Sequence, residues 1–235
     1  MDFRLQPLGD QAVVIELGQS INIENHQKVE MVVAYFEEVS IDWVIEYIPA
    51  YASVTVFYDI LKVSKQAEGQ LPYDYVCDQL KVLLADVKVK EQIEPRVVDI
   101  PVCYGGEFGP DLEYVAEYNG LSTSKVIELH SNGDYLVYML GFAPGFPFIG
   151  GMDQQIATPR QKSPRLKIPD GTVGIANNQT GVYPIETPGG WQLIGRTPLK
   201  LFKPEQSPPT LLQAGDKIKF KPISYDEFLE KEAEQ

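Results

Sequence analysis

Hydrophobic residues in the first part of the chain follow two periods, one typical of helices and one typical of strands. Residues 22–39 place apolar side chains on one helical face, at Val29, Val32, Val33, Phe36 and Val39. A second helical stripe follows Pro72, a residue suited to the start of a helix. Three short runs rich in β-branched and aromatic residues predict strands, at 11–17, 43–48 and 53–58. The order β-α-β-β-α predicts a small α+β domain over residues 1–92.

The pattern changes after residue 97, where short apolar runs alternate with turns rich in glycine and proline. A strand at 97–102 precedes two short helices, at 111–118 and 122–131. Six further runs predict strands, at 134–140, 172–176, 180–185, 191–195, 198–202 and 217–222. Many short strands of this kind are typical of a barrel or a sandwich. Ser224 and Glu227 have the spacing of a capping box, which predicts a final helix.

The two patterns meet in a charged stretch, residues 88–96, which is typical of a linker between domains. We therefore expect an N-terminal α+β domain at 1–92, a linker at 93–96 and a β-rich domain at 97–235. The fold class predicted for the whole chain is α+β.

The chain is strongly acidic, with 20 Lys and Arg residues against 33 Asp and Glu residues and a formal net charge of −13. This charge repels phosphate backbones and anionic lipids, so we expect neither a nucleic-acid partner nor a membrane partner. No apolar run approaches the roughly 20 residues that span a membrane. The first ten residues also lack the apolar core of a signal peptide. We therefore expect a cytoplasmic protein.

The chain contains two cysteines, Cys77 and Cys103, and two histidines, His26 and His130. The cysteines form no CxxC motif, so neither a disulfide framework nor a Cys/His metal site is predicted. His26 falls among polar positions of the first helix and is expected to be solvated. His130 ends a short helix, where a positive charge is favourable. The alternative for His130 is a catalytic residue that transfers a proton.

The familiar catalytic motifs GxSxG and HExxH are absent from the sequence. Residues 145–151 contain paired glycines but lack the Lys-Ser/Thr that completes a P-loop. The chain therefore shows no nucleotide-binding loop and no evident nucleophile with its base.

Glycine, proline and positive charge concentrate in one region. Residues 139–195 hold ten of the 19 glycines and seven of the 18 prolines, and residues 160–203 carry seven bases and two acids. Glycine permits close approach of a ligand, and arginine offers paired donors to a carboxylate or phosphate. The predicted substrate or anion site comprises Arg160, Arg165, Gln179, Thr180, Tyr183 and Arg196. A predicted aromatic groove, also suited to a partner, comprises Phe142, Phe146, Phe148 and Trp191. The alternative is a set of tight barrel corners, with Arg165 and Arg196 in structural ion pairs.

Several long motifs in this region carry a resemblance to a known family. GFAPGFPFIGG (141–151), VGIANNQTGVYP (173–184) and TPGGWQLIGRTP (187–198) resemble the family of the 5-oxoprolinase B subunit, also called allophanate hydrolase subunit 1. PLGDQA near the start and AGDKIKF near the end extend the resemblance over essentially the whole chain. That family includes the Kip-type inhibitor of a sporulation sensor histidine kinase.

The resemblance implies a small α+β domain followed by a cyclophilin-like β-barrel. It also implies an enzyme that opens 5-oxo-L-proline to L-glutamate with ATP as co-substrate, in which this chain is the non-autonomous B subunit. The implied partners are two further 5-oxoprolinase subunits, one of the C type with a related barrel and one of the A type.

Two other functions remain open: inhibition of sensor histidine kinase autophosphorylation, and a role as subunit of an allophanate hydrolase-type amidohydrolase. We favour the 5-oxoprolinase, because that family is broader than the sporulation pathway. The sequence offers anion-binding groups without a complete catalytic set, which fits one half of a site that a partner completes.

Overall fold

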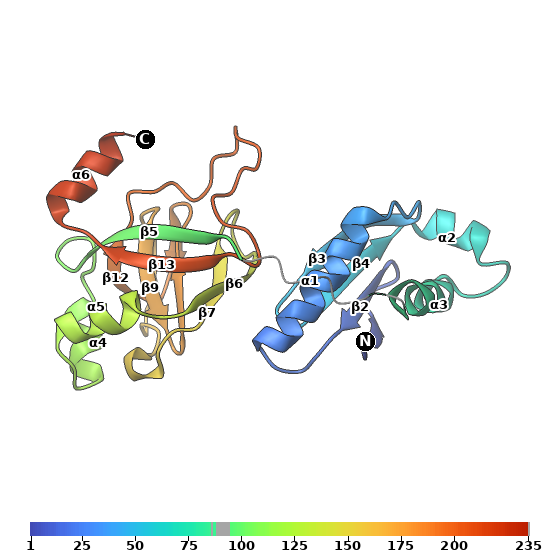
Figure 1. Ribbon diagram of the computed structural model, residues 1–235, viewed down its shortest axis with the longest axis horizontal. Coiled ribbons are helices and arrows are strands. Elements are labelled where there is room, and N and C mark those ends of the chain that lie inside the picture. Colours follow the sequence, from blue (N-terminus) through green and yellow to red (C-terminus); the bar gives the residue numbers. More distant parts are fainter. Residues whose placement is uncertain (86, 88–94, 235) are drawn as a thin grey trace. The chain divides into compact units, whose positions relative to one another are not determined.

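A computed structural model of the chain describes residues 1–85, 87 and 95–234. The chain forms two compact units, Met1–Glu94 and Pro95–Gln235, each with a sheet and helices of its own (Figure 1). The first two residues of the predicted linker, 93 and 94, lie outside the described residues. None of the described helices is long and apolar enough to cross a membrane.

The first unit is a four-stranded antiparallel sheet with helices packed against it. The strand order is β1-β2-β4-β3, with bounds Arg4–Pro7, Ala12–Glu16, Ser53–Tyr58 and Val44–Pro49. Alternate residues of β4 are buried and share one core with the apolar faces of α1 (Ile23–Glu38) and α3 (Pro72–Ala85). The hydrophobic pattern predicts all of these elements except the edge strand β1. It also does not predict the short helix α2 (Ile60–Gln66).

His26 is buried, so the solvated position expected for it is wrong. Its exposed fraction is 2%, and its Nε2 lies 3.3 Å from Oε1 of Glu30, one turn later in α1. His26 precedes Val29 by three residues and extends the buried stripe of the helix towards its N-cap at Asn22. The apolar stripe used for the prediction begins at Val29, so it does not include the first turn of the helix, where His26 lies.

The second unit is built around a closed seven-stranded barrel, which confirms the predicted α+β fold class with a β-barrel domain. Around the barrel the strands are β10 (Gln179–Val182), β7 (Pro147–Gly150), β6 (Tyr135–Leu140), β13 (Lys217–Pro222), β5 (Val97–Tyr104), β12 (Gln192–Arg196) and β9 (Thr172–Ala176). Strand β13 pairs in parallel with β5, and the other neighbours pair antiparallel. Buried apolar residues such as Val102, Val137, Ile175 and Phe220 belong to its core.

Further helices and a small separate sheet belong to this unit, and Figure 1 shows the helices at one end of the barrel. Helices α4 (Leu112–Tyr118) and α5 (Thr123–Ser131) contribute apolar residues to the same core, and a 3-10 turn, η1, spans Gln154–Ile156. Strands β8 (Arg165–Ile168) and β11 (Thr187–Gly189) form a separate antiparallel pair. Helix α6 (Tyr225–Ala233) begins at the predicted capping box, where Glu227 N–H donates to Ser224 Oγ at 3.3 Å.

The strand predicted at 198–202 is wrong, because this segment is a loop with an isolated bridge from Phe202 to Thr210. Pro198 has no N–H to donate to a ladder, and Leu199 N–H donates to Thr197 Oγ1 at 3.2 Å. Leu201 is 1% exposed and belongs to the barrel core. Its apolar character therefore reflects a loop anchored in the core.

Candidate functional site

Strand β10 divides the predicted site residues between two environments. Side chains alternate across a strand, and Thr180 and Val182 are buried in the barrel interior. Gly181 faces the outer side, where aromatic rings lie against it, and Tyr183 belongs to the same outer group of residues. Gln179 is the first residue of β10 and pairs with Ala176. It lies two residues before Gly181 and therefore on the same outer face of the strand. The hydroxyl groups of Thr180 and Tyr183 therefore lie in different surroundings.

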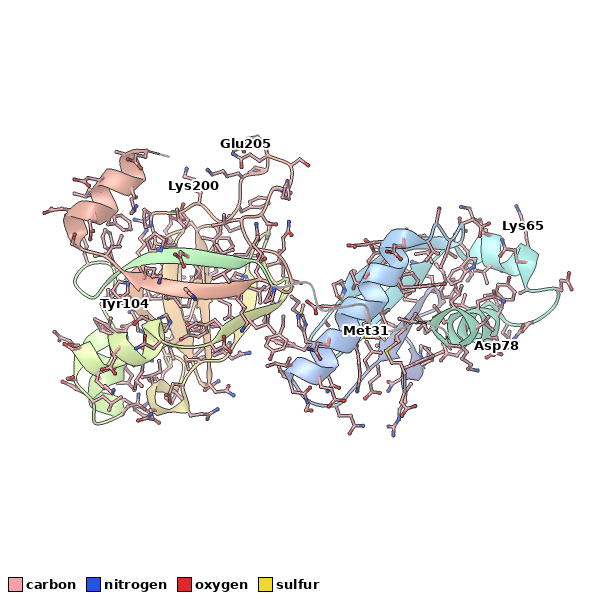
Figure 2. The ribbon with its side chains drawn as sticks, viewed as in Figure 1. Met31, Lys65, Asp78, Tyr104, Lys200 and Glu205 are labelled. Carbon is pink, nitrogen blue, oxygen red and sulfur yellow. The ribbon has the colours of Figure 1, made fainter. Side chains whose placement is uncertain are left out.

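Thr180 joins a hydrogen-bonded chain inside the barrel. His130 Nε2 lies 2.8 Å from Thr180 Oγ1, and His130 Nδ1 lies 2.7 Å from the hydroxyl of Tyr104, the last residue of β5. Tyr104 is labelled in Figure 2. The Thr180 hydroxyl donates to the carbonyl oxygen of Gly174 at 3.1 Å. Because that hydroxyl has one proton, we assign Nε2–H of His130 as donor to Thr180 and Nδ1 as acceptor from Tyr104. The chain connects β5, α5, β10 and β9.

Burial keeps His130 neutral. Its side chain is fully enclosed, and its ring lies 4.5 Å from the ring of Phe220 between centroids. Burial lowers the pKa of His130 from 6.5 to about 3. A neutral imidazole gains nothing from the helix dipole, and an enclosed one cannot touch a ligand on the surface. Within the barrel His130 therefore connects Tyr104 with Thr180, and its catalytic role stays a prediction.

Five aromatic residues gather outside the barrel wall, and we call them the aromatic cluster: Phe142, Phe146, Phe148, Tyr183 and Trp191. The Phe146 ring is central, with its centroid 5.5 Å from those of Phe142 and Phe148, 5.8 Å from Tyr183 and 5.9 Å from Trp191, all edge to face. Phe146 is buried, whereas Phe142 is 75% exposed and has a φ of 68°. A bulky residue rarely adopts that left-handed conformation, and such strain concentrates at functional surfaces.

Glycines allow the rings of this cluster to lie directly on the backbone. A Cβ at Gly181 would lie 3.0 Å from the Trp191 ring and 3.1 Å from the Phe146 ring. A Cβ at Gly189 would lie 2.4 Å from the Tyr183 hydroxyl oxygen. All three distances are too short for an undisturbed side chain, so these two glycines fix where the aromatic rings sit.

Arg196 is engaged by residues outside the aromatic cluster. Its Nε–H donates to the carbonyl oxygen of Asp170 at 2.8 Å, and its guanidinium also donates to the Asp170 carboxylate at 3.2 Å. The guanidinium carbon lies 5.9 Å from the ring centroid of Phe108 and 5.8 Å from that of Phe228 on α6. These contacts are the structural pairing considered as the alternative in the sequence, and they join α6 to the barrel.

Arg165 is paired with a buried carboxylate that the sequence identifies only as the start of a helix. It donates to Asp111 Oδ1 at 2.8 Å, and the same oxygen accepts from Gln161 Nε2 at 3.1 Å. Asp111 Oδ2 accepts from the backbone N–H of Leu193 at 2.7 Å. Asp111 thereby ties the segment 161–165 to β12, next to Trp191.

Arg160 and Tyr183 keep donors that pair with no described residue. The Arg160 guanidinium carbon lies 5.9 Å from the ring centroid of Trp191, and no described carboxylate forms an ion pair with it. Tyr183 is 2% exposed, yet within the part of the chain that the structure describes its hydroxyl makes no hydrogen bond. Burial raises the pKa of Tyr183 to about 12, an effect reduced by the Arg160 and Arg165 charges. At neutral pH this phenol is therefore a hydrogen-bond donor.

Two cavities of the second unit lie away from the aromatic cluster. One, of about 380 Å³, is lined by residues 103–108 and 223–225. The other, of about 560 Å³, includes Asp99, Lys221 and Lys231 in its lining. Among residues 1–85, 87 and 95–234, no three His, Cys, Asp or Glu side chains are grouped to hold a metal ion.

Comparison with known proteins identifies the family of this chain. Residues 3–212 match the family described as carboxyltransferase domain, subdomain C and D. The chain is 53% identical over 228 residues to the 5-oxoprolinase B subunit of Bacillus subtilis (strain 168), covering 96% of this chain and 95% of that protein. The chain belongs to the 5-oxoprolinase B-subunit family. The Escherichia coli O157:H7 protein of the same name is 41% identical, covering 92% of this chain and 94% of its own length.

A solved structure extends this similarity. Conserved uncharacterized protein PH0987 from Pyrococcus horikoshii shares 45% sequence identity and a TM-score of 0.56, covering 96% of this chain and all of that chain. Membership of the 5-oxoprolinase B-subunit family confirms the resemblance carried by the long motifs. Those motifs also build the aromatic cluster, because 141–151 supplies its three phenylalanines and 187–198 supplies Trp191.

Proposed function

We propose that this chain is the B subunit of an ATP-dependent 5-oxoprolinase, which cleaves 5-oxo-L-proline to L-glutamate together with partner subunits. The observation that carries the proposal is the 53% identity to a 5-oxoprolinase B subunit over nearly the full length of both chains. The aromatic cluster with Arg160 and Tyr183 is the proposed contribution of this chain to the substrate site.

The chemistry of the aromatic cluster suits such a substrate. 5-Oxoproline is a five-membered cyclic amide that bears one carboxylate. Aromatic rings offer an apolar surface for the ring of the substrate, and a guanidinium pairs with its carboxylate. Trp191 and Arg160 place these two groups 5.9 Å apart, measured from ring centroid to guanidinium carbon.

The proposal makes this chain one part of a shared site. An amide is a poor electrophile, so its hydrolysis benefits from ATP-driven activation and from stabilisation of charge on the carbonyl oxygen. Among the described residues at the aromatic cluster we find binding groups but no serine, cysteine or lysine nucleophile hydrogen-bonded to a base. ATP is proposed as co-substrate of the assembled complex.

The proposed partners are 5-oxoprolinase subunits of the C type and the A type. The face proposed for contact comprises residues 139–151 and 187–196, where Phe142 is 75% exposed. On the neighbouring strand β8, Leu166 is 88% exposed. Large exposed apolar side chains are typical of surfaces that an assembly covers.

Glutamate release from 5-oxoproline tests the proposal, measured for this chain alone, for the mixture with C-type and A-type subunits, and for that mixture without ATP. We expect release only from the complete mixture with ATP, together with a stable complex in size-exclusion mass measurements. Turnover by the purified chain alone would refute a shared site. Inhibition of a sensor histidine kinase without any such complex would favour the regulatory function, and cleavage of allophanate in place of 5-oxoproline would favour the amidohydrolase alternative.

A further inference from the structure

Two donors that make no hydrogen bond or ion pair within the described residues flank one aromatic ring. Arg160 lies over Trp191, with 5.9 Å from guanidinium carbon to ring centroid, and the Tyr183 ring lies 6.3 Å from the same ring between centroids. The other two predicted arginines are committed elsewhere, Arg165 to Asp111 and Arg196 to Asp170. Besides the indole N–H of Trp191, the described part of the cluster therefore offers a ligand one guanidinium and one phenol.

The phenol is held in a fixed position. The Tyr183 ring contacts Phe146 and Trp191 edge to face, and its hydroxyl oxygen lies close against Gly189. The Tyr183 side chain is 2% exposed, and its hydroxyl makes no hydrogen bond to a described residue. Its oxygen is not among the described polar atoms that are both enclosed and unpartnered, so it stays accessible to a ligand. Arg160, by contrast, is exposed and can adjust to its ligand.

We propose a division of labour that rests on the proposed function: the Tyr183 hydroxyl donates a hydrogen bond to the lactam carbonyl oxygen of 5-oxoproline, and Arg160 pairs with its carboxylate. The ring of the substrate then lies against Trp191. Tyr183 thereby distinguishes a cyclic amide acid from ring acids that lack the carbonyl group.

The assignment follows from the chemistry of the two donors. A carboxylate has two oxygens that match the parallel donors of a guanidinium, whereas a carbonyl oxygen needs a single donor. Exchanging the two roles would leave the carboxylate with one neutral donor and place a full positive charge on a neutral oxygen. Arg160 is also the arginine of the predicted site that keeps its charge without a described carboxylate partner.

Competition by substrate analogues in the assembled enzyme tests this assignment. 2-Pyrrolidinone keeps the lactam but lacks the carboxylate, and cyclopentanecarboxylate keeps ring and carboxylate but lacks the amide. We expect Tyr183→Phe to weaken the binding of 5-oxoproline and of 2-pyrrolidinone by roughly 3- to 10-fold, the range of one neutral hydrogen bond. Binding of cyclopentanecarboxylate should stay unchanged in that variant. Arg160→Gln should weaken the binding of 5-oxoproline and of cyclopentanecarboxylate by about 10-fold or more. It should leave the binding of 2-pyrrolidinone unchanged.

Tyr118→Phe, on the exposed face of α4, is the matched control and should leave all three affinities unchanged. The division of labour is wrong if Tyr183→Phe weakens both analogues equally, or weakens neither, in a complex that turns over 5-oxoproline normally before substitution. An unsubstituted complex that neither binds nor cleaves 5-oxoproline would instead overturn the proposed function itself. The two failures are therefore distinguishable in one set of measurements.

Discussion

His130 and Thr180 are joined across the barrel interior by a hydrogen bond of 2.8 Å, from the last turn of α5 to strand β10. The next residue of that strand, Gly181, supports the rings of Trp191 and Phe146 on the outer side. The hydrogen bond inside the barrel therefore stabilises the inner face of β10, and the aromatic cluster packs against the outer face of the same strand. This relationship explains why a buried histidine lies so near a surface proposed to bind substrate.

Replacing His130 by phenylalanine should destabilise the second unit without changing its fold. The variant keeps an aromatic ring but leaves the Tyr104 hydroxyl without a partner, and a buried unsatisfied polar group costs about 1–3 kcal/mol. We expect the free energy of unfolding to fall by about that amount, measured with urea by Trp191 fluorescence in a Trp43→Phe background. Unchanged stability combined with loss of activity would show that His130 acts in catalysis instead.

The stability of the second unit should depend on pH through His130. Its pKa is about 3 when folded and near 6.5 when exposed, so below pH 6.5 the unfolded chain binds one more proton. The contribution of neutral His130 to the free energy of unfolding is complete above pH 6.5. It falls as the pH drops from 6.5 towards 3, by about 1.4 kcal/mol per pH unit. His130→Gln has no such group to titrate and should lack this part of the slope. Parallel pH profiles for both proteins would contradict a neutral buried histidine.

Asp111→Asn should loosen the segment that carries Arg160 and Arg165. Breaking an enclosed ion pair costs about 3–5 kcal/mol, and we expect about 2 kcal/mol here because the Arg165 side chain is 29% exposed. Glu186→Gln is the control, since its partner Lys167 is 77% exposed and such surface pairs contribute under about 1 kcal/mol. Urea denaturation of both variants provides the comparison, and equal losses would exclude a positioning role for Asp111.

Gly181→Ala should displace the rings of the aromatic cluster. The added methyl group would lie 3.0 Å from Trp191 and 3.1 Å from Phe146, and overpacking of this kind costs about 1–3 kcal/mol. We expect lower stability and a shift in Trp191 emission. Gly190→Ala is the control, because its nearest neighbour would lie 3.7 Å away. A normal Trp191 spectrum in the Gly181 variant would show that the rings tolerate the extra carbon.

The assignment of residues to the two faces of β10 can be predicted from the sequence, whereas the pairing of Asp111 with Arg165 cannot. A strand near residues 180–185 already places Thr180 and Tyr183 on opposite faces, because side chains alternate. Treating both hydroxyls as one site ignored that alternation. Asp111 and Arg165 are 54 residues apart, and no period or local motif relates them. The same limit hides the pairing of Arg196 with Asp170 and the contact of Arg196 with Phe228 of α6.

Family membership was predictable because long motifs carry it, and the fold class followed from hydrophobic periods. Element boundaries were harder to predict where strands are very short. Strands β7, β8 and β11 have four, four and three residues, too few to show a period, and glycine and proline flank them. Leu201 shows the opposite error, since a single buried side chain in a loop resembles a strand residue.

The rate of ATP-dependent glutamate release by the assembled complex, compared between Arg160→Gln and Arg196→Gln, tests the central claim most directly. If this chain supplies the substrate-binding part of a shared site through Arg160, that variant should lose about 10-fold or more in kcat/KM, the cost of one charged hydrogen bond. Arg196→Gln should keep its activity and show a lower melting temperature, because its contacts hold α6 in place. Full activity of Arg160→Gln together with inactive Arg196→Gln would contradict this assignment of the site.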